Sequence, residues 1–243
     1  MKKKVLLVLS FALMLISATV PVVADVNPLP TDNIEISRQD AYYDEALNAY
    51  VVSFTLNSDN TLNYLTKAEV SNLNQITESQ VSALKLPELS DDLIVKPRGY
   101  YEYYRFEKTS GPYQASGARR KVSADFEAPI GGGSVTKHIS FTVTETFSAN
   151  VTNDLAKSAI KAGAGFTWSK SASVGTSYTV YLLTGQIGYI GFTPYYDKVN
   201  GILRKYSNWD GFIGSWTASG YSVKKTYDGE ADGLYQLVIT NQY

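Results

Sequence analysis

The sequence predicts a mainly β fold of elongated antiparallel sheets or a β-sandwich, with one long amphipathic hairpin and a small acidic N-terminal region that carries short helices. Three observations predict it. β-Branched and aromatic residues alternate with polar ones along most of the chain, Gly, Pro, Asn and Asp interrupt these runs, and residues 134–182 keep a period of two. At 44% hydrophobic and 19% charged residues, the chain has enough apolar side chains to form a core.

Residues 1–24 have the pattern of a bacterial secretory signal peptide. Three lysines at positions 2–4 precede an apolar run over residues 5–16, and the small residue Ala24 stands where a signal peptidase would cleave. The apolar run is shorter than the ~20 residues of a transmembrane helix. We therefore expect a secreted, extracellular protein.

The charge changes sign along the remaining chain, which suggests two regions. Residues 25–95 hold 12 acids and 3 bases, net −9, whereas residues 96–243 hold 11 acids and 16 bases, net +5. The acidic region either packs on the basic remainder or presents an ordinary solvated surface. We expect an acidic N-terminal region over 25–95 and an all-β domain over 96–243, and the overall acidity argues against a nucleic-acid partner.

A short repeat lies inside the acidic region. Residues 66–73 and 77–84 both follow the pattern Thr-x-x-Glu/Gln-Val-Ser-x-Leu, in which the first and fourth residues form a helical capping box. Each copy therefore predicts the start of a short helix. These helices would lie against a sheet that begins with a strand over residues 50–56.

Tyrosines supply the candidate receptor-binding residues. Clustered rings stack on sugars and hold choline-type head groups by cation–π contact, so a glycan or a lipid head group is the expected ligand class. The alternative is that these tyrosines are strand formers whose hydroxyls reach water. The candidates are Tyr100, Tyr101, Tyr103, Tyr104, Tyr195 and Tyr196.

Residues 134–182 give the clearest pattern, a long β-hairpin with one polar and one apolar face. From 134 to 152 every even position is polar, and from 162 to 182 the parity is reversed, so that apolar residues take most even positions. Residues 153–161 between the two runs allow one or two helical turns. One face of the hairpin would thus carry Ser and Thr, and the other would be apolar.

The register of this hairpin follows from its charges. Pairing Glu145 with Lys170 makes the numbers of opposed residues sum to 315. The same register sets Phe141 opposite Val174 and adds aromatic and hydroxyl cross-strand pairs, each of which favours pairing by ~0.2–1 kcal/mol. We predict this register and a Glu145–Lys170 charge pair.

A hairpin of this kind resembles the insertion hairpin of aerolysin-like β-pore-forming toxins, most clearly at residues 142–144 and 169–174. It is also similar to Ser-rich hairpins of secreted proteins from Gram-positive bacteria. The toxin resemblance implies a homo-oligomer on a cell surface or membrane that inserts residues 134–182 as a transmembrane β-barrel. It implies lipid-facing positions at Phe141, Val143, Phe147, Val151, Phe166, Trp168 and Val174. It implies lumen-facing positions at Thr142, Thr144, Thr146, Ser148, Thr167, Ser169, Ser171 and Ser173.

The alternative is a non-lytic secreted β-sandwich that binds carbohydrate or cell wall, with the apolar hairpin face packed under a second sheet. Catalytic motifs are scarce in either case. The chain has no cysteine and a single histidine, His138, so thiolate chemistry and multi-histidine metal sites are excluded. We expect no enzymatic activity, no cofactor and no metal, although a two-carboxylate hydrolase leaves no local spacing to recognise.

Overall fold

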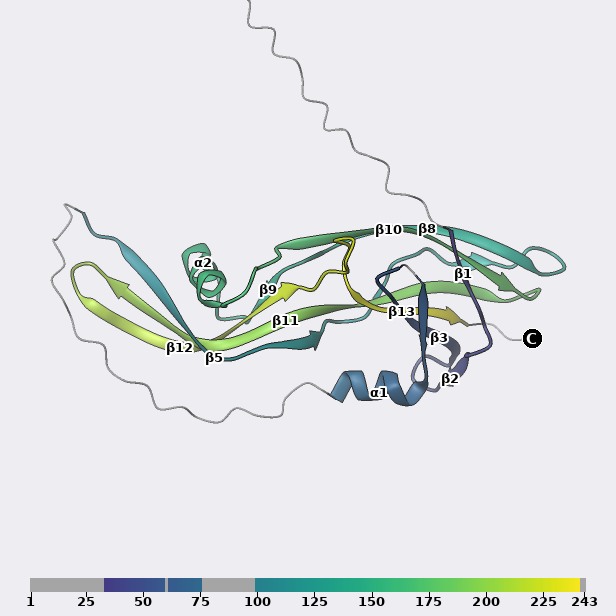
Figure 1. Ribbon diagram of the computed structural model, residues 1–243, viewed down its shortest axis with the longest axis horizontal. Helices are drawn as coiled ribbons and strands as arrows, with labels where there is room; N and C mark the ends of the chain where they lie inside the picture. The colour runs from purple at the N-terminus through teal and green to yellow at the C-terminus, as the bar shows by residue number, and fades with distance from the viewer. Residues whose placement is uncertain (1–32, 60, 76–98, 241–243) are drawn as a thin grey trace, which may run out of the picture. The chain divides into compact units, whose positions relative to one another are not determined.

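The computed structural model describes residues 33–59, 61–75 and 99–240. The predicted signal peptide, the second helical repeat and the boundary near residue 95 lie outside these residues. Strands dominate the described chain, as predicted, and almost all of them pair antiparallel. The protein therefore has a mainly β fold with two helices among its described residues (Figure 1).

A three-stranded sheet holds the predicted hairpin. Its order is β1–β10–β8, with β1 parallel and β8 antiparallel to the central strand. These strands are β1 (Asn33–Ile36), β10 (Ser171–Leu182) and β8 (Gly133–Thr144).

A larger sheet is organised around β11 (Ile187–Ser207), a strand of 21 residues. The first part of β11 pairs with β13, β6 and β7, and its second part pairs with β12 and β5. β3 continues the sheet from β13, and β2 and β4 pair with β3. The bounds are β2 (Tyr42–Asp44), β3 (Ala49–Leu56), β4 (Leu62–Leu65), β5 (Glu102–Ser116), β6 (Arg120–Lys121), β7 (Phe126–Glu127), β9 (Thr146–Phe147), β12 (Gly211–Val223) and β13 (Gly233–Ile239).

The strands of the acidic N-terminal region take part in both sheets. β1 pairs with β10, and β3 pairs with β13, so each sheet joins segments from both ends of the sequence. The predicted strand over 50–56 is β3, whose Val51, Val52 and Phe54 are fully buried. Apolar burial thus ties the acidic strands to the rest of the fold despite the change of charge along the chain.

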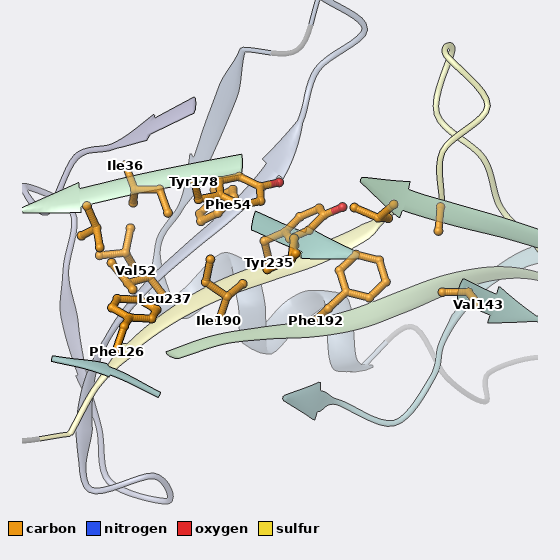
Figure 2. Close-up of a cluster of buried hydrophobic side chains, with 14 of the residues drawn as sticks. Ile36, Val52, Phe54, Phe126, Val143, Tyr178, Ile190, Phe192, Tyr235 and Leu237 are labelled. Carbon is orange, nitrogen blue, oxygen red and sulfur yellow. The ribbon is translucent and has the colours of Figure 1, made fainter. Parts of the chain in front are cut away.

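The main hydrophobic core lies between the two sheets. Figure 2 shows Tyr178 of β10 beside Phe54 and Tyr235 of the larger sheet. The ring centroid of Tyr178 lies 5.6 Å from that of Phe54 and 5.6 Å from that of Tyr235, and the Phe54 ring stacks on the Tyr235 ring. The hairpin therefore packs face to face on a second sheet, as in a β-sandwich.

Helix α1 (Lys67–Gln75) begins as the first copy of the repeat predicts. The backbone N–H of Thr66 donates to the Glu69 carboxylate at 2.8 Å, and the Glu69 N–H donates to the Thr66 hydroxyl at 3.3 Å. These are the two reciprocal bonds of a capping box. The Thr66 N–H and the Thr66 hydroxyl both donate to the Glu69 carboxylate, which lowers the pKa of Glu69 below its ordinary value. The prediction is confirmed for this copy.

Helix α2 (Asp154–Gly163) lies between the two alternating runs, where the sequence allows one or two helical turns. The side chain of Asn153 caps it by accepting from the Leu155 N–H at 2.7 Å, and Ala156 and Ile160, one turn apart, are buried. α2 packs on β5, β11 and β12 in a second cluster. The helical turns predicted over residues 153–161 are thus confirmed. The prediction that the paired strands run to residue 152 and resume at residue 162 is wrong, because Thr146 and Phe147 pair with β12 and β10 begins only at Ser171.

Candidate functional site

The paired part of the hairpin, β8 with β10, is a ribbon whose faces divide as predicted. The even residues of β8 are exposed and the odd ones are buried or half-buried, while in β10 the even residues are buried. Hydroxyls pair across the polar face, Thr136 with Thr179 at 2.6 Å and Thr142 with Ser173 at 2.9 Å. His138 lies on this face beside Ser177, at 3.2 Å.

The predicted register of the ribbon is confirmed. Every pair from Thr144–Ser171 to Gly133–Leu182 has residue numbers that sum to 315, including Phe141 opposite Val174. The pairing ends at the Glu145 N–H, which donates to the Lys170 carbonyl at 2.7 Å. The agreement follows from period two, since a one-residue slip would turn the whole apolar face outward.

The predicted Glu145–Lys170 charge pair is wrong. The Glu145 carboxylate instead accepts from the ammonium of Lys161 on α2 and from the indole N–H of Trp168, the latter at 2.5 Å. Lys170 is exposed and has no carboxylate within 4 Å among the described residues. α2 folds back over the end of the ribbon and brings Lys161 to Glu145, and this contact ties the helix to the ribbon.

The candidate lipid-facing residues are packed inside the protein. Val143 and Val174 are buried in the core between the sheets, and the ring of Phe141 lies 4.8 Å from that of Phe192. The remaining four, Phe147, Val151, Phe166 and Trp168, belong to the α2 cluster. A lipid-facing role would therefore require the ribbon to leave the second sheet.

The candidate lumen-facing residues divide between ribbon and loops. On the ribbon, Thr142, Thr144, Ser171 and Ser173 are exposed on one face. The other four lie outside the ribbon: Thr146 is in β9, and Ser148, Thr167 and Ser169 are in the connections to α2. Ser169 is held by the larger sheet, because its N–H donates to the Ser222 hydroxyl at 2.8 Å and its carbonyl accepts from the Val223 N–H at 3.1 Å.

A loop after β12 also holds the ribbon. The Glu230 carboxylate accepts from the Gly175 N–H at 3.2 Å, and the Ala231 N–H donates to the Ser173 carbonyl at 3.3 Å. Both contacts reach β10 from the opposite sheet. The loop between β12 and β13 thus helps to hold the ribbon in place.

Exposed aromatic rings gather where β5 begins and where β11 turns into β12. We call this cluster the aromatic tip; it comprises the exposed Tyr100, Tyr101, Trp209 and Phe212, the exposed aliphatic Ile213, and the half-buried Tyr103 and Tyr206. Tyr206 lies between Tyr103 and Phe212 across the strands, with centroid distances of 5.3 and 5.7 Å. Trp209 and Phe212 are 60% and 54% exposed, an unusual amount for such large apolar side chains.

Three of the predicted receptor-binding tyrosines lie away from the tip. Tyr195 and Tyr196 are each only 5% exposed and belong to hydrophobic clusters, so the prediction that they meet a receptor is wrong for this structure. Burial raises the pKa of Tyr195 to about 12, because its phenolate would be poorly solvated. Tyr104 turns to the opposite strand face and packs edge-on against Trp216, 6.1 Å away.

Sequence reasoning missed Trp209, Phe212 and Ile213, although a signal for them exists. Residues 207–211 read Ser-Asn-Trp-Asp-Gly, a turn sequence with a tryptophan inside it. Gly211 has φ +70°, a left-handed conformation that glycine adopts freely. A tryptophan placed in a turn between two strands has no core to enter and stays exposed.

A pocket of about 490 Å³ opens beside the end of the ribbon. Lys170, Asp197 and Lys225 bring charges to it, and burial raises the pKa of the Asp197 carboxyl. The remaining lining residues are Thr167, Trp168, Ser169, Ser171 and Val223. Within the described residues no three His, Asp or Glu side chains gather as a metal site requires, and no helix there has the length and apolarity to span a bilayer.

Fold and site together define a mainly β protein with a two-faced ribbon fastened to a second sheet and a separate, exposed aromatic tip. Comparisons with protein-family models, with curated proteins and with solved structures gave no match. The functional argument therefore depends on the molecule's own geometry.

Proposed function

We propose that this secreted protein binds a cell surface or membrane, oligomerises there and inserts residues 134–182 as a transmembrane β-barrel pore. The observation that carries the proposal is the ribbon of β8 and β10, with hydroxyls on one face and a nearly continuous apolar surface on the other. A closed barrel of such ribbons satisfies every backbone hydrogen bond in lipid.

The length of the ribbon suits a bilayer. Each strand has 12 residues, against the ~9–11 that a tilted transmembrane strand needs. Glu145 and Lys170 stand just beyond the last pair, Thr144–Ser171, so both charges would fall outside the hydrocarbon. Lys137 is the one charge on the apolar face of the ribbon, and it would cost about 2–4 kcal/mol at the midplane and less toward an interface.

Separating the ribbon from the second sheet in water costs free energy, so the ribbon stays packed on that sheet before the protein meets a membrane. Exposing a buried side chain of Val, Leu or Ile size costs about 1.5–3 kcal/mol, so detaching the ribbon face costs on the order of 10 kcal/mol. A bilayer accepts the same side chains without that cost. The side chains concerned are Ile139, Val143, Ala172, Val174, Tyr178, Val180 and Leu182.

A reversible lock tests the proposal directly. The chain has no cysteine, so a pair introduced as Ser169→Cys and Ser222→Cys can form only one disulfide, and it would join the end of the ribbon to β12, where the Ser169 backbone N–H donates to the Ser222 hydroxyl at 2.8 Å. We expect the oxidised variant to release no dye from liposomes and to form no SDS-resistant oligomers, and reduction to restore both.

A matched control crosslinks the ribbon to itself. His138 and Ser177 oppose each other on the exposed face, so the pair His138→Cys and Ser177→Cys joins β8 to β10 without tying either to the larger sheet. This variant should release dye whether oxidised or reduced. Equal dye release from the locked and control proteins would contradict insertion of the ribbon.

The alternative function is a non-lytic β-sandwich that binds carbohydrate or cell wall. The close packing of the ribbon's apolar face against the second sheet favours it, because a sandwich of this kind is complete without a membrane. Intact vesicles together with retention of the protein on glycan or peptidoglycan would support this function instead.

A further inference from the structure

We infer that the aromatic tip docks the protein directly onto the phospholipid–water interface of a bilayer, with Arg105 meeting the lipid phosphates. The inference rests on the proposed function and names the partner of its first step. Four tip side chains from two segments, Tyr100, Tyr101, Trp209 and Phe212, are each about half exposed, and Ile213 beside them is 43% exposed. Water-exposed apolar side chains gathered in this way mark an interaction surface.

The tip is held in shape before any partner arrives. The Ser207 hydroxyl accepts from the Asp210 N–H at 2.7 Å and donates to the Asp210 carboxylate at 2.9 Å, which fixes the turn that carries Trp209. Asn208, which is buried, accepts from the Tyr101 N–H at 2.9 Å and donates to the Gly99 carbonyl at 2.7 Å. The start of β5 is therefore pinned to the turn, and docking would cost little conformational entropy.

The charges of the tip suit a phosphate surface. The Glu102 carboxylate pairs with the Lys205 ammonium at 2.7 Å and accepts from the Tyr100 hydroxyl, and both contacts lower the pKa of Glu102. The Asp210 carboxylate accepts from the Ser207 hydroxyl. Arg105 is exposed and has no carboxylate within 4 Å among the residues that the structure describes. Its guanidinium is therefore available to meet an anion.

Ring geometry favours lipid over a sugar. Tyr103 and Tyr206 stack on each other at an interplanar angle of 11°, and Arg105 lies over both rings, 5.7 and 5.6 Å from their centroids. Their faces are thus occupied, whereas a sugar ring needs a free aromatic face. Trp209 and Phe212 project from a turn, and Ile213 adds an aliphatic side chain, which is the mixture that partitions into a membrane interface.

Vesicle binding of the whole protein tests the inference. We would measure co-sedimentation with protein-free phosphatidylcholine vesicles, with and without phosphatidylserine, for the wild type and for the double variant Trp209→Ser, Phe212→Ser. Losing two interfacial aromatics should weaken partitioning at least about tenfold. Tyr227→Ser is the matched control, because Tyr227 is 88% exposed on a different loop and should leave binding unchanged.

Two further measurements sharpen the result. Arg105→Gln should weaken binding about fivefold and reduce its salt dependence, since one basic residue near an anionic surface contributes modestly. Bromine-labelled lipids should quench the tryptophan fluorescence of the oxidised Ser169–Ser222 lock, and adding Trp209→Phe to that lock should remove most of the quenching, because Trp168 and Trp216 are partly buried against the α2 cluster of the closed protein.

The outcomes separate this inference from pore formation. The oxidised lock at Ser169 and Ser222 should still bind vesicles while releasing no dye, so docking is measurable even if insertion fails. The inference would be overturned if the double tip variant bound vesicles like the wild type. It would equally be overturned if the wild type ignored protein-free vesicles and bound only glycan-bearing or protein-bearing surfaces.

Discussion

Neighbouring residues on opposite faces of β10 test the face assignment by stability. Val174 is 1% exposed and lies in the core between the sheets, whereas Ser173 is exposed and its hydroxyl bonds to that of Thr142 on the same open face. Val174→Ala removes two methyl groups at about 0.8 kcal/mol each, and the cavity left behind adds to this. We expect a loss of about 2–3 kcal/mol in the free energy of unfolding for Val174→Ala, and of less than about 0.5 kcal/mol for Ser173→Ala.

The assay is equilibrium urea unfolding followed by tryptophan fluorescence, with the midpoint and slope fitted for each variant. A lower midpoint at unchanged slope for Val174→Ala alone is the expected result. If Ser173→Ala lowered the midpoint as much, or if Val174→Ala left it unchanged, the apolar face of the ribbon would not be the buried one. The face assignment would then fail for both the closed protein and the pore.

Two other changes test the packing of the ribbon and of the core. Glu145→Ala leaves the ammonium of Lys161 and the indole N–H of Trp168 without their half-buried acceptor, so it should lower the free energy of unfolding by about 1–3 kcal/mol. The control Asp125→Ala removes an exposed ion pair and should lower it by less than about 1 kcal/mol in the same urea assay. The buried Tyr195 stays neutral in the folded protein up to about pH 12 while the unfolded chain ionises near pH 10, so stability should fall as the pH rises from about 10 to 12. Tyr195→Phe should reduce that fall in urea midpoints measured across this range, and an unchanged pH dependence would contradict the assignment.

Much of the fold could be predicted because period two is a strong signal. In β8 the alternation of Ser/Thr with Val, Ile and Phe fixes the burial of each face and allows only registers with β10 that differ by even shifts. Setting Glu145 opposite Lys170 selected the correct one, although their side chains do not pair. The same reasoning failed beyond Thr144. There the alternation continues in the sequence, but Thr146 and Phe147 pair with β12, and Val151 and Phe166 join the cluster around α2 instead of pairing across the hairpin. Tertiary packing decided between two locally acceptable patterns.

The candidate site was less predictable, because a surface depends on which strand ends meet. Tyr100, Tyr101 and Tyr103 could be singled out from their spacing, but their neighbours Trp209 and Phe212 lie about a hundred residues later in the chain. Only the pairing of β5 with β11 brings them together. The failure at Tyr195 and Tyr196 also comes from tertiary packing, since Tyr195 packs with Leu65 and Val70 and Tyr196 lies in the core between the sheets.

Helix α2 determines which part of pore formation would be slow. The ribbon itself can leave one apolar environment for another, but residues 145–170 at its end must cross the bilayer first. They carry Asp154, Lys157 and Lys161 in α2, and each charge costs several kcal/mol in hydrocarbon unless it is paired. The Asp154–Lys157 and Lys161–Glu145 ion pairs reduce that cost only while the helix stays folded against the ribbon. Under the proposed function, crossing of this charged segment therefore limits the rate, and several copies assembled on one surface would be needed to form a polar path for it.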